Sequence, residues 1–249
     1  MVGLEYPNAW AKCAINRTRY PDSPEPRMYA SFARVAYNGD AAVLLGGHGA
    51  NQVVFNDTWL LVFDGIALDG NAWPTCGWRK LTIVGDAPST LGAASLRTIP
   101  PGHPLKNDLI LFGGCASGAV FRESQQTCSD PSNETMVVDL LAGPNGPPTL
   151  EFKRLNSTGD VTNASFGQLV VTKDSVHLIG GTRLNGTDHD LFQMTGWRAE
   201  VVNSSLQWER LQPSDRLLVF YGLPSVGWDE DNDAILIAGV LNATTKVCL

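Results

Sequence analysis

Histidine is the side chain of this sequence best suited to chemistry, and the chain has only four histidines. His48 and His189 each follow a Gly-Gly doublet, and Asp188 and Asp190 flank His189. Imidazole and carboxylate groups in such an arrangement could bind a metal ion. Because a histidine in a polar loop is usually only solvated, we expect no metal and no cofactor.

Sequence motifs of the common enzyme classes are missing. The chain contains no GxSxG, no HExxH, no P-loop and no GxGxxG after a strand. Its 25 acidic residues outnumber its 18 basic ones, and a net charge of −7 disfavours nucleic acid as a partner. No apolar run approaches about 20 residues, so we expect no membrane span. We therefore expect a protein that is not an enzyme and that binds a protein or a glycan.

Asparagines in the pattern Asn-x-Ser/Thr are more frequent than chance, which would give about two. The excess predicts a glycoprotein of the secretory pathway, secreted or extracellular/lumenal. Asn56, just before a predicted strand, is expected to be poorly accessible. The first 22 residues lack the pattern of a signal peptide, so we expect the rest of a larger polypeptide to accompany this chain. The eight sites are Asn16, Asn56, Asn133, Asn156, Asn163, Asn185, Asn203 and Asn242.

The five cysteines are consistent with an oxidising compartment. Cys115 and Cys128 lie in one long loop, and we predict a disulfide between them because a loop of that size needs stapling. Cys13 and Cys248 lie near opposite ends of the chain, and Cys76 has no evident partner. The pairing of these three stays open.

Short apolar runs bounded by turn residues indicate the elements that would position these side chains. Between residues 27 and 83 four such runs are separated by NG, GG and DG turns. Runs of this length, rich in β-branched and aromatic residues, predict strands joined as an antiparallel meander. Trp59, Phe63 and Trp78 are expected to fill the space between this meander and its neighbours.

The meander recurs along the chain. Its Gly-Gly doublet reappears at a spacing of 67 residues (113 − 46 and 180 − 113), and a weaker copy ends near Gly239. A repeated supersecondary unit predicts stacked or radially arranged blades. The expected blades span about 27–83, 90–155, 164–211 and 217–249, and residues 1–26 could supply outer strands of a split blade. The doublets are Gly46-Gly47, Gly113-Gly114 and Gly180-Gly181.

Four apolar residues, a Gly-Gly doublet, a variable loop, an aromatic strand and a Trp before the last strand together resemble the kelch repeat. The resemblance covers about residues 27–249. It implies an all-β, kelch-type β-propeller of four-stranded antiparallel blades, with three full blades and parts of a fourth. The period of 67 residues exceeds the roughly 50 residues of kelch repeats, so the loops are expected to be long.

Within that resemblance the chain is most similar to extracellular, attractin-like kelch regions. The resemblance implies recognition of a protein or glycan through loops that share one face. Two alternatives stay open: a carbohydrate-acting propeller enzyme, either an oxidase or hydrolase-like, and a cytosolic kelch adaptor. The loop residues expected to bind the ligand are His48, Asn51, Arg122, Glu123, Gln125, Asp188 and His189.

Overall fold

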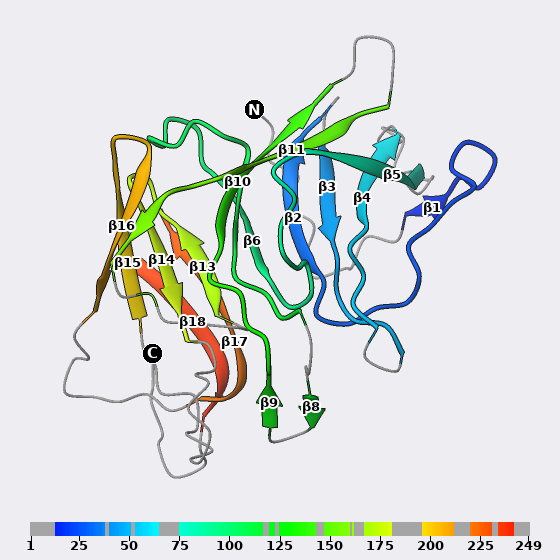
Figure 1. Cartoon of the computed structure of the whole chain (residues 1–249). Coiled ribbons are helices and arrows are strands. Elements are labelled where there is room, and N and C mark those ends of the chain that lie inside the picture. The colour runs from blue at the N-terminus through cyan, green and yellow to red at the C-terminus, as the bar shows by residue number, and fades with distance from the viewer. Residues whose placement is uncertain are drawn as a thin grey trace.

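The protein is a partial β-propeller in which antiparallel sheets stand side by side as blades (Figure 1). Within the ranges that the structure describes, the regular elements are strands and no α-helix occurs. This confirms the predicted all-β fold class. The computed structural model describes residues 13–37, 40–50, 53–64, 75–116, 120–122, 125–142, 147–159, 161, 167–180, 196–211, 220–230 and 234–241.

Three blades are four-stranded meanders, and each runs in chain order from its inner to its outer strand. Blade one contains β2 (Ser31–Ala36), β3 (Asp40–Leu45), β4 (Thr58–Asp64) and β5 (Thr75–Gly85). Blade two contains β6 (Ser95–Thr98), β7 (Leu109–Phe112), β10 (Thr135–Leu141) and β11 (Thr149–Arg154). Blade three contains β13 (Gln168–Val171), β14 (Ser175–Ile179), β15 (Gly196–Val202) and β16 (Ser205–Arg210).

The remaining strands lie outside these three blades. Strands β17 (Phe220–Asp229) and β18 (Ala234–Leu241) form a two-stranded hairpin, as do β8 (Val120–Arg122) and β9 (Gln125–Thr127). Strands β1 (Ala14–Ile15) and β12 (Ser157–Thr158) have two residues each.

Each blade's outer strand is joined in parallel by the chain segment that precedes the blade. Strand β1 pairs with β5, the end of β5 pairs with β11, and β12 pairs with β16. A disulfide between Cys13 and Cys76 fixes the first of these additions. Sequence reasoning found no partner for Cys76, because the parallel pairing that brings these cysteines together has no local signal.

The first strands of successive blades lie next to one another. Ser31 donates a hydrogen bond to the carbonyl of Ala94, which joins β2 to the start of β6 at 2.5 Å. The Arg97 Nε donates to the carbonyl of Leu169, and the Leu169 amide donates to the Ser95 hydroxyl, both at 2.9 Å. These bonds position β2, β6 and β13 side by side.

Two apolar clusters fill the spaces between blades. Leu45, Leu60 and Phe152 belong to the cluster between blades one and two, and Phe112 and Trp197 belong to the cluster between blades two and three. All four residues of β7 are buried. A strand buried on both faces needs an unbroken apolar sequence, which explains the runs that precede the Gly-Gly doublets.

The aromatic residues of blade one lie on the face that points away from blade two. Leu60 and Val62 of β4 belong to the cluster shared with blade two. Because side chains alternate along a strand, Trp59 and Phe63 of β4 face the opposite way. Trp59 is buried, Phe63 is 38% exposed and Trp78 is half-buried. These aromatic residues were expected to fill the space between blade one and its neighbours, and on the side of blade two Leu60 and Val62 fill that space instead.

Candidate recognition face

The Gly-Gly doublets follow directly after β3, β7 and β14, where the chain leaves each second strand for a loop. Gly46 and Gly47 have φ of 53° and 101°, and Gly113 and Gly114 have φ of 73° and 122°. These left-handed values strain any residue with a Cβ, so the doublets are turn-forming residues. We call the end of the molecule where these loops emerge the Gly-Gly face; it lies at the bottom of Figure 1.

The connector between blades one and two packs between the loops of both. A Cβ at Gly92 would lie 2.6 Å from His48 Nε2 and 2.9 Å from the Cys115 carbonyl oxygen. The Cys115 amide donates to the Gly92 carbonyl at 2.6 Å, and the Thr90 hydroxyl donates to the Cys115 carbonyl at 2.9 Å. We call this packing of residues 90–92 against the two loops the base of the Gly-Gly face. It fixes the positions of the two loops relative to each other.

His48 belongs to that base and not to the surface. Its side chain and backbone are 1% exposed, and its amide donates to the Met28 carbonyl at 2.8 Å. Burial lowers the pKa of His48, which favours the neutral imidazole. The prediction that His48 contacts a ligand is wrong, because its position directly after the doublet puts the imidazole under the neighbouring connector.

A hairpin stands where the sequence indicated only a long loop. Strands β8 and β9 pair with Arg122 opposite Gln125, so these two predicted residues lie at its tip. The predicted disulfide Cys115–Cys128 is confirmed and lies at the base of the hairpin, which projects at the bottom of Figure 1. The disulfide restricts the direction in which the hairpin leaves the blade.

Four predicted ligand contacts lie outside the described residues: Asn51, Glu123, Asp188 and His189. Of Arg122 and Gln125 the structure describes the backbone. Across the described residues, no group of three potential metal-ligating side chains comes together.

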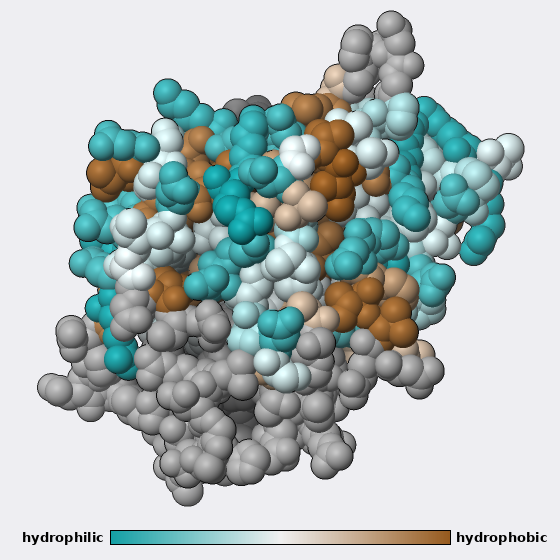
Figure 2. Space-filling view, in the orientation of Figure 1, coloured by the Kyte–Doolittle hydropathy of each residue, from teal (hydrophilic) through white to brown (hydrophobic). Residues whose placement is uncertain are grey.

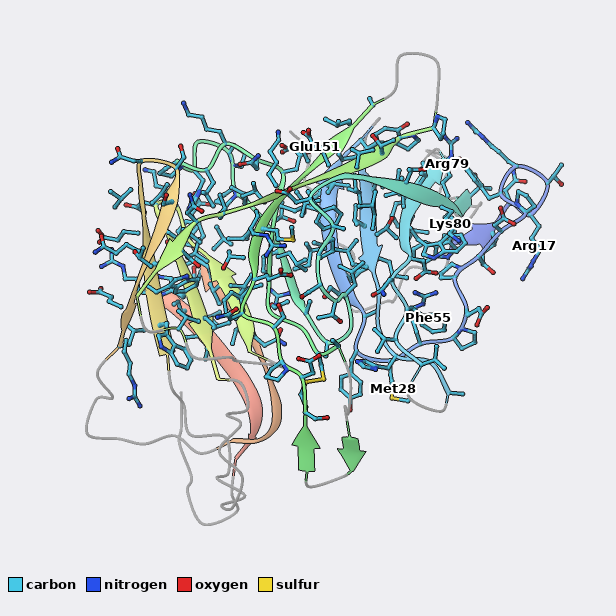
Figure 3. The ribbon with its side chains drawn as sticks, viewed as in Figure 1. Arg17, Met28, Phe55, Arg79, Lys80 and Glu151 are labelled. Atoms are coloured by element: carbon cyan, nitrogen blue, oxygen red, sulfur yellow. A yellow bond between two sulfur atoms is a disulfide. The ribbon has the colours of Figure 1, made fainter. Side chains whose placement is uncertain are left out.

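An apolar patch on the Gly-Gly face was missed by sequence reasoning. Met28 is 51% exposed, Val53 is 55% exposed and Phe55 is half-buried. Backbone bridges from His48 to Met28 and to Val54 bring the two segments together. Figure 2 shows brown surface at this place, and Figure 3 labels Met28 and Phe55 there. The signal was the apolar run 53–55 inside an otherwise polar loop.

An ion pair anchors the patch to blade one. Arg27 pairs with Asp57 through two guanidinium nitrogens, donates to the Gly46 carbonyl at 2.9 Å and lies 4.3 Å from the centre of the Phe55 ring. The indole of Trp59 donates to Asp57 at 2.7 Å. Burial raises the pKa of Asp57, but the bonds from Arg27 and Trp59 outweigh it and leave this pKa below its usual value.

The same position in blade two carries a similar acid. Glu134 directly precedes β10, as Asp57 precedes β4, and it accepts a hydrogen bond from the Ser89 amide at 2.8 Å and pairs with Arg154. Burial raises the pKa of Glu134, but the bonds from Ser89 and the charge of Arg154 lower it overall. An acid at this position therefore closes the long loop in both blades.

The predicted glycosylation sites that the structure describes lie at the surface or near it. Asn16 is half-buried, and its side-chain oxygen accepts a hydrogen bond from the Arg19 amide at 3.0 Å. Asn163, Asn185 and Asn242 lie outside the described residues. The expectation that Asn56 is poorly accessible is wrong, because Asn56 is exposed although it lies only two positions before β4. The exposed asparagines are Asn56, Asn133, Asn156 and Asn203.

The two disulfides are consistent with an extracellular or lumenal location. In the described part of the chain, no helix has the length and apolar character needed to cross a bilayer.

One comparison with a solved structure supports the fold. No protein-family model and no curated protein matches the sequence. Among solved structures, the chain is similar to "Structure of YjhT", with a TM-score of 0.52 and 18% identity over 86% of this chain. The chain spans 58% of that protein's length. A match to "Cryo-EM structure of RAG in complex with one melted RSS and one unmelted RSS" has a TM-score of 0.49 and 16% identity, and it covers 87% of this chain and 67% of that one.

Proposed function

We propose that the chain is an extracellular or lumenal kelch-type propeller module that recognises a protein or a glycan through its Gly-Gly face. The observation that carries this is the apolar patch of Met28, Val53 and Phe55, beside loops held by the Gly92 packing and by a disulfide. Exposed apolar side chains on a rigid base are typical of surfaces that bind partners. A protein partner fits an apolar patch better than a sugar does.

The kelch assignment is supported by the position of the doublets. All three doublets directly follow the second strand of a four-stranded meander, and Trp78 lies in the fourth strand of blade one. The secretory assignment is supported by the exposed Asn56, Asn133, Asn156 and Asn203 and by both disulfides. Mass spectrometry of glycopeptides from a secreting host should find glycans at several of these four sites, and an unmodified chain would contradict the compartment.

A glycan placed on the patch tests the recognition face. Val53→Thr completes a sequon at Asn51, two residues before the patch residue Val53 in the sequence, and all proteins compared carry Asn56→Gln so that the natural sequon next to Phe55 adds no sugar there. The matched control, Lys173→Asn, completes a sequon with Ser175 in the exposed turn between β13 and β14, on the opposite end of the blades. We expect the secreted wild-type chain and the control to bind a panel of cultured cells, and the Val53 variant to lose that binding. Equal binding by all three, or none by the wild type, would contradict the proposal.

A further inference from the structure

An apolar surface covers the side of blade one that points away from blade two. Val62 of β4 belongs to the cluster between blades one and two, so its neighbours Leu61 and Phe63 point to the opposite side. Pairing across β2, β3, β4 and β5 brings side chains of the other three strands onto this same side. We call this surface the outward face of blade one, and its apolar residues are Phe32, Leu44, Trp59, Leu61, Phe63 and Trp78.

Much of the outward face is open to solvent. Phe32 is 50% exposed and Phe63 is 38% exposed. Leu44, Leu61 and Trp78 are half-buried. Contiguous aromatic and aliphatic side chains at a surface mark an interface with another protein segment, because their contact with water is unfavourable.

Blades two and three show what covers the equivalent face. In blade two, Leu111 lies two residues before the doublet and belongs to one buried cluster with Val43 of blade one. In blade three, Leu178 lies at the same position and belongs to one buried cluster with Ile110 of blade two. Both covering residues, Val43 and Ile110, lie three residues before their own doublet. One blade therefore covers the next with this position of its second strand.

The hairpin of β17 and β18 presents the same covering position to solvent. Leu236 of β18 lies three residues before Gly239, near which the fourth copy of the repeat ends. Strand β17 contacts β13, the first strand of blade three, so the hairpin occupies the place of a fourth blade. Leu236 is 57% exposed. The hairpin thus has an open side of the kind that closes each junction inside the chain.

We propose that the outward face of blade one binds the β17–β18 hairpin of a second copy of this chain, independently of the Gly-Gly face. Phe32 and Leu236 are both exposed, and blade one and the hairpin lie on opposite sides of the molecule in Figure 1, so the two surfaces of one copy do not cover each other. The chain carries both halves of a junction that it already makes twice, which favours a second copy over an unrelated protein. Two different surfaces meet in this contact, so the copies join head to tail.

Sedimentation velocity of the whole chain, produced in a secreting host, tests this contact. Phe32→Asp places a charge on the outward face, and Leu236→Asp places one on the hairpin. Val53→Asp is the matched control, at a similarly exposed apolar residue of the Gly-Gly face. We expect the wild type and the control to associate at about 0.1 mM, and each of the other two variants alone to associate at least about tenfold more weakly. A 1:1 mixture of the Phe32 and Leu236 variants should form a complex of two chains, because each variant keeps one intact surface.

The same measurements separate the head-to-tail contact from its alternatives. Association lost in Phe32→Asp but kept in Leu236→Asp would show that two outward faces bind each other, against the proposal. A monomeric wild type at this concentration would overturn self-association and leave the outward face to a different protein. A loss in Val53→Asp equal to the loss in the other variants would move the contact to the Gly-Gly face. Thermal melts check folding, and Phe32→Ser and Leu236→Ser replace any variant that melts early.

Discussion

Individual residues at the start of the third strands show how the long loops are closed. Asp57 and Glu134 occupy the same position in blades one and two, and each binds an arginine and a backbone or side-chain donor. The acid and the preceding asparagine were visible in the sequence as part of a sequon. Their role was not, because the arginines that bind them are 30 and 20 residues distant along the chain (57 − 27 and 154 − 134).

Replacement of Gly46 tests the turn that follows β3. Gly46→Ala should destabilise the protein by at least about 2 kcal/mol, from a strained φ of 53° and from a clash of the new Cβ with the Leu91 backbone. Gly102 is the matched control, because its φ of 86° is also positive but nothing lies within 4 Å of a Cβ there. Urea melts should show that Gly102→Ala costs less. Equal losses in the free energy of unfolding would mean that the clash with the Leu91 backbone adds nothing to the effect of Gly46→Ala.

Acidification should weaken the base of the Gly-Gly face. Burial lowers the pKa of His48 below 6.5, so the unfolded chain takes up the proton first and stability falls as the pH drops below that value. The low pKa of Asp57 contributes stability above about pH 4, which is lost only as the pH falls through the lowered value. We expect His48→Gln to reduce the difference in Tm between about pH 7.5 and about pH 5.5.

Part of the dependence of Tm on pH should remain in His48→Gln, because His103 also contributes to it. Burial lowers its pKa too, against the charge of Asp174 and the backbone of Ser175, and it remains in the variant. An unchanged pH dependence in His48→Gln would show that the buried imidazole of His48 is not linked to unfolding.

At the level of elements, the sequence predicted the strands of each blade better than their partners. Apolar runs and doublets located β3, β7 and β14, because a strand buried on both faces has a strong local signature. The parallel additions β1 and β12 have two residues each and no such signature. The orientation of Trp59 and Phe63 could not be predicted from the sequence either, because it depends on which face of β4 meets the next blade.

Two tryptophans of blade one should differ in their contribution to stability. Trp59 is 6% exposed and donates its indole N–H to Asp57, whereas Trp78 is half-buried. Trp59→Ala should cost about 3–5 kcal/mol in a urea melt, and Trp78→Ala should cost clearly less. A larger loss of stability for Trp78→Ala than for Trp59→Ala would mean that Trp78 contributes more to packing than its exposure indicates.

At the level of the whole molecule, the three blades repeat one register. Leu96 pairs with Leu111, and Leu169 pairs with Leu178, two residues before the doublet in each case. These residues face the preceding blade and are 2% exposed or less. The equivalent pair in blade one is Phe32 and Leu44, where Phe32 is 50% exposed. Blade one therefore has an apolar face of the kind that the other blades bury.

Matched substitutions at Phe32 and Leu96 test whether this face is available. Leu96→Ser should cost about 3–5 kcal/mol, because it leaves a cavity and a buried hydroxyl between blades one and two. Phe32→Ser should cost less than about 1 kcal/mol, because half of the ring is already in contact with water. Light scattering should show less self-association for Phe32→Ser than for the wild type, since removal of the ring interrupts an exposed apolar surface. An equal loss of stability at Phe32 and at Leu96 would show that the outward face of blade one is buried in the same way as the equivalent faces of blades two and three.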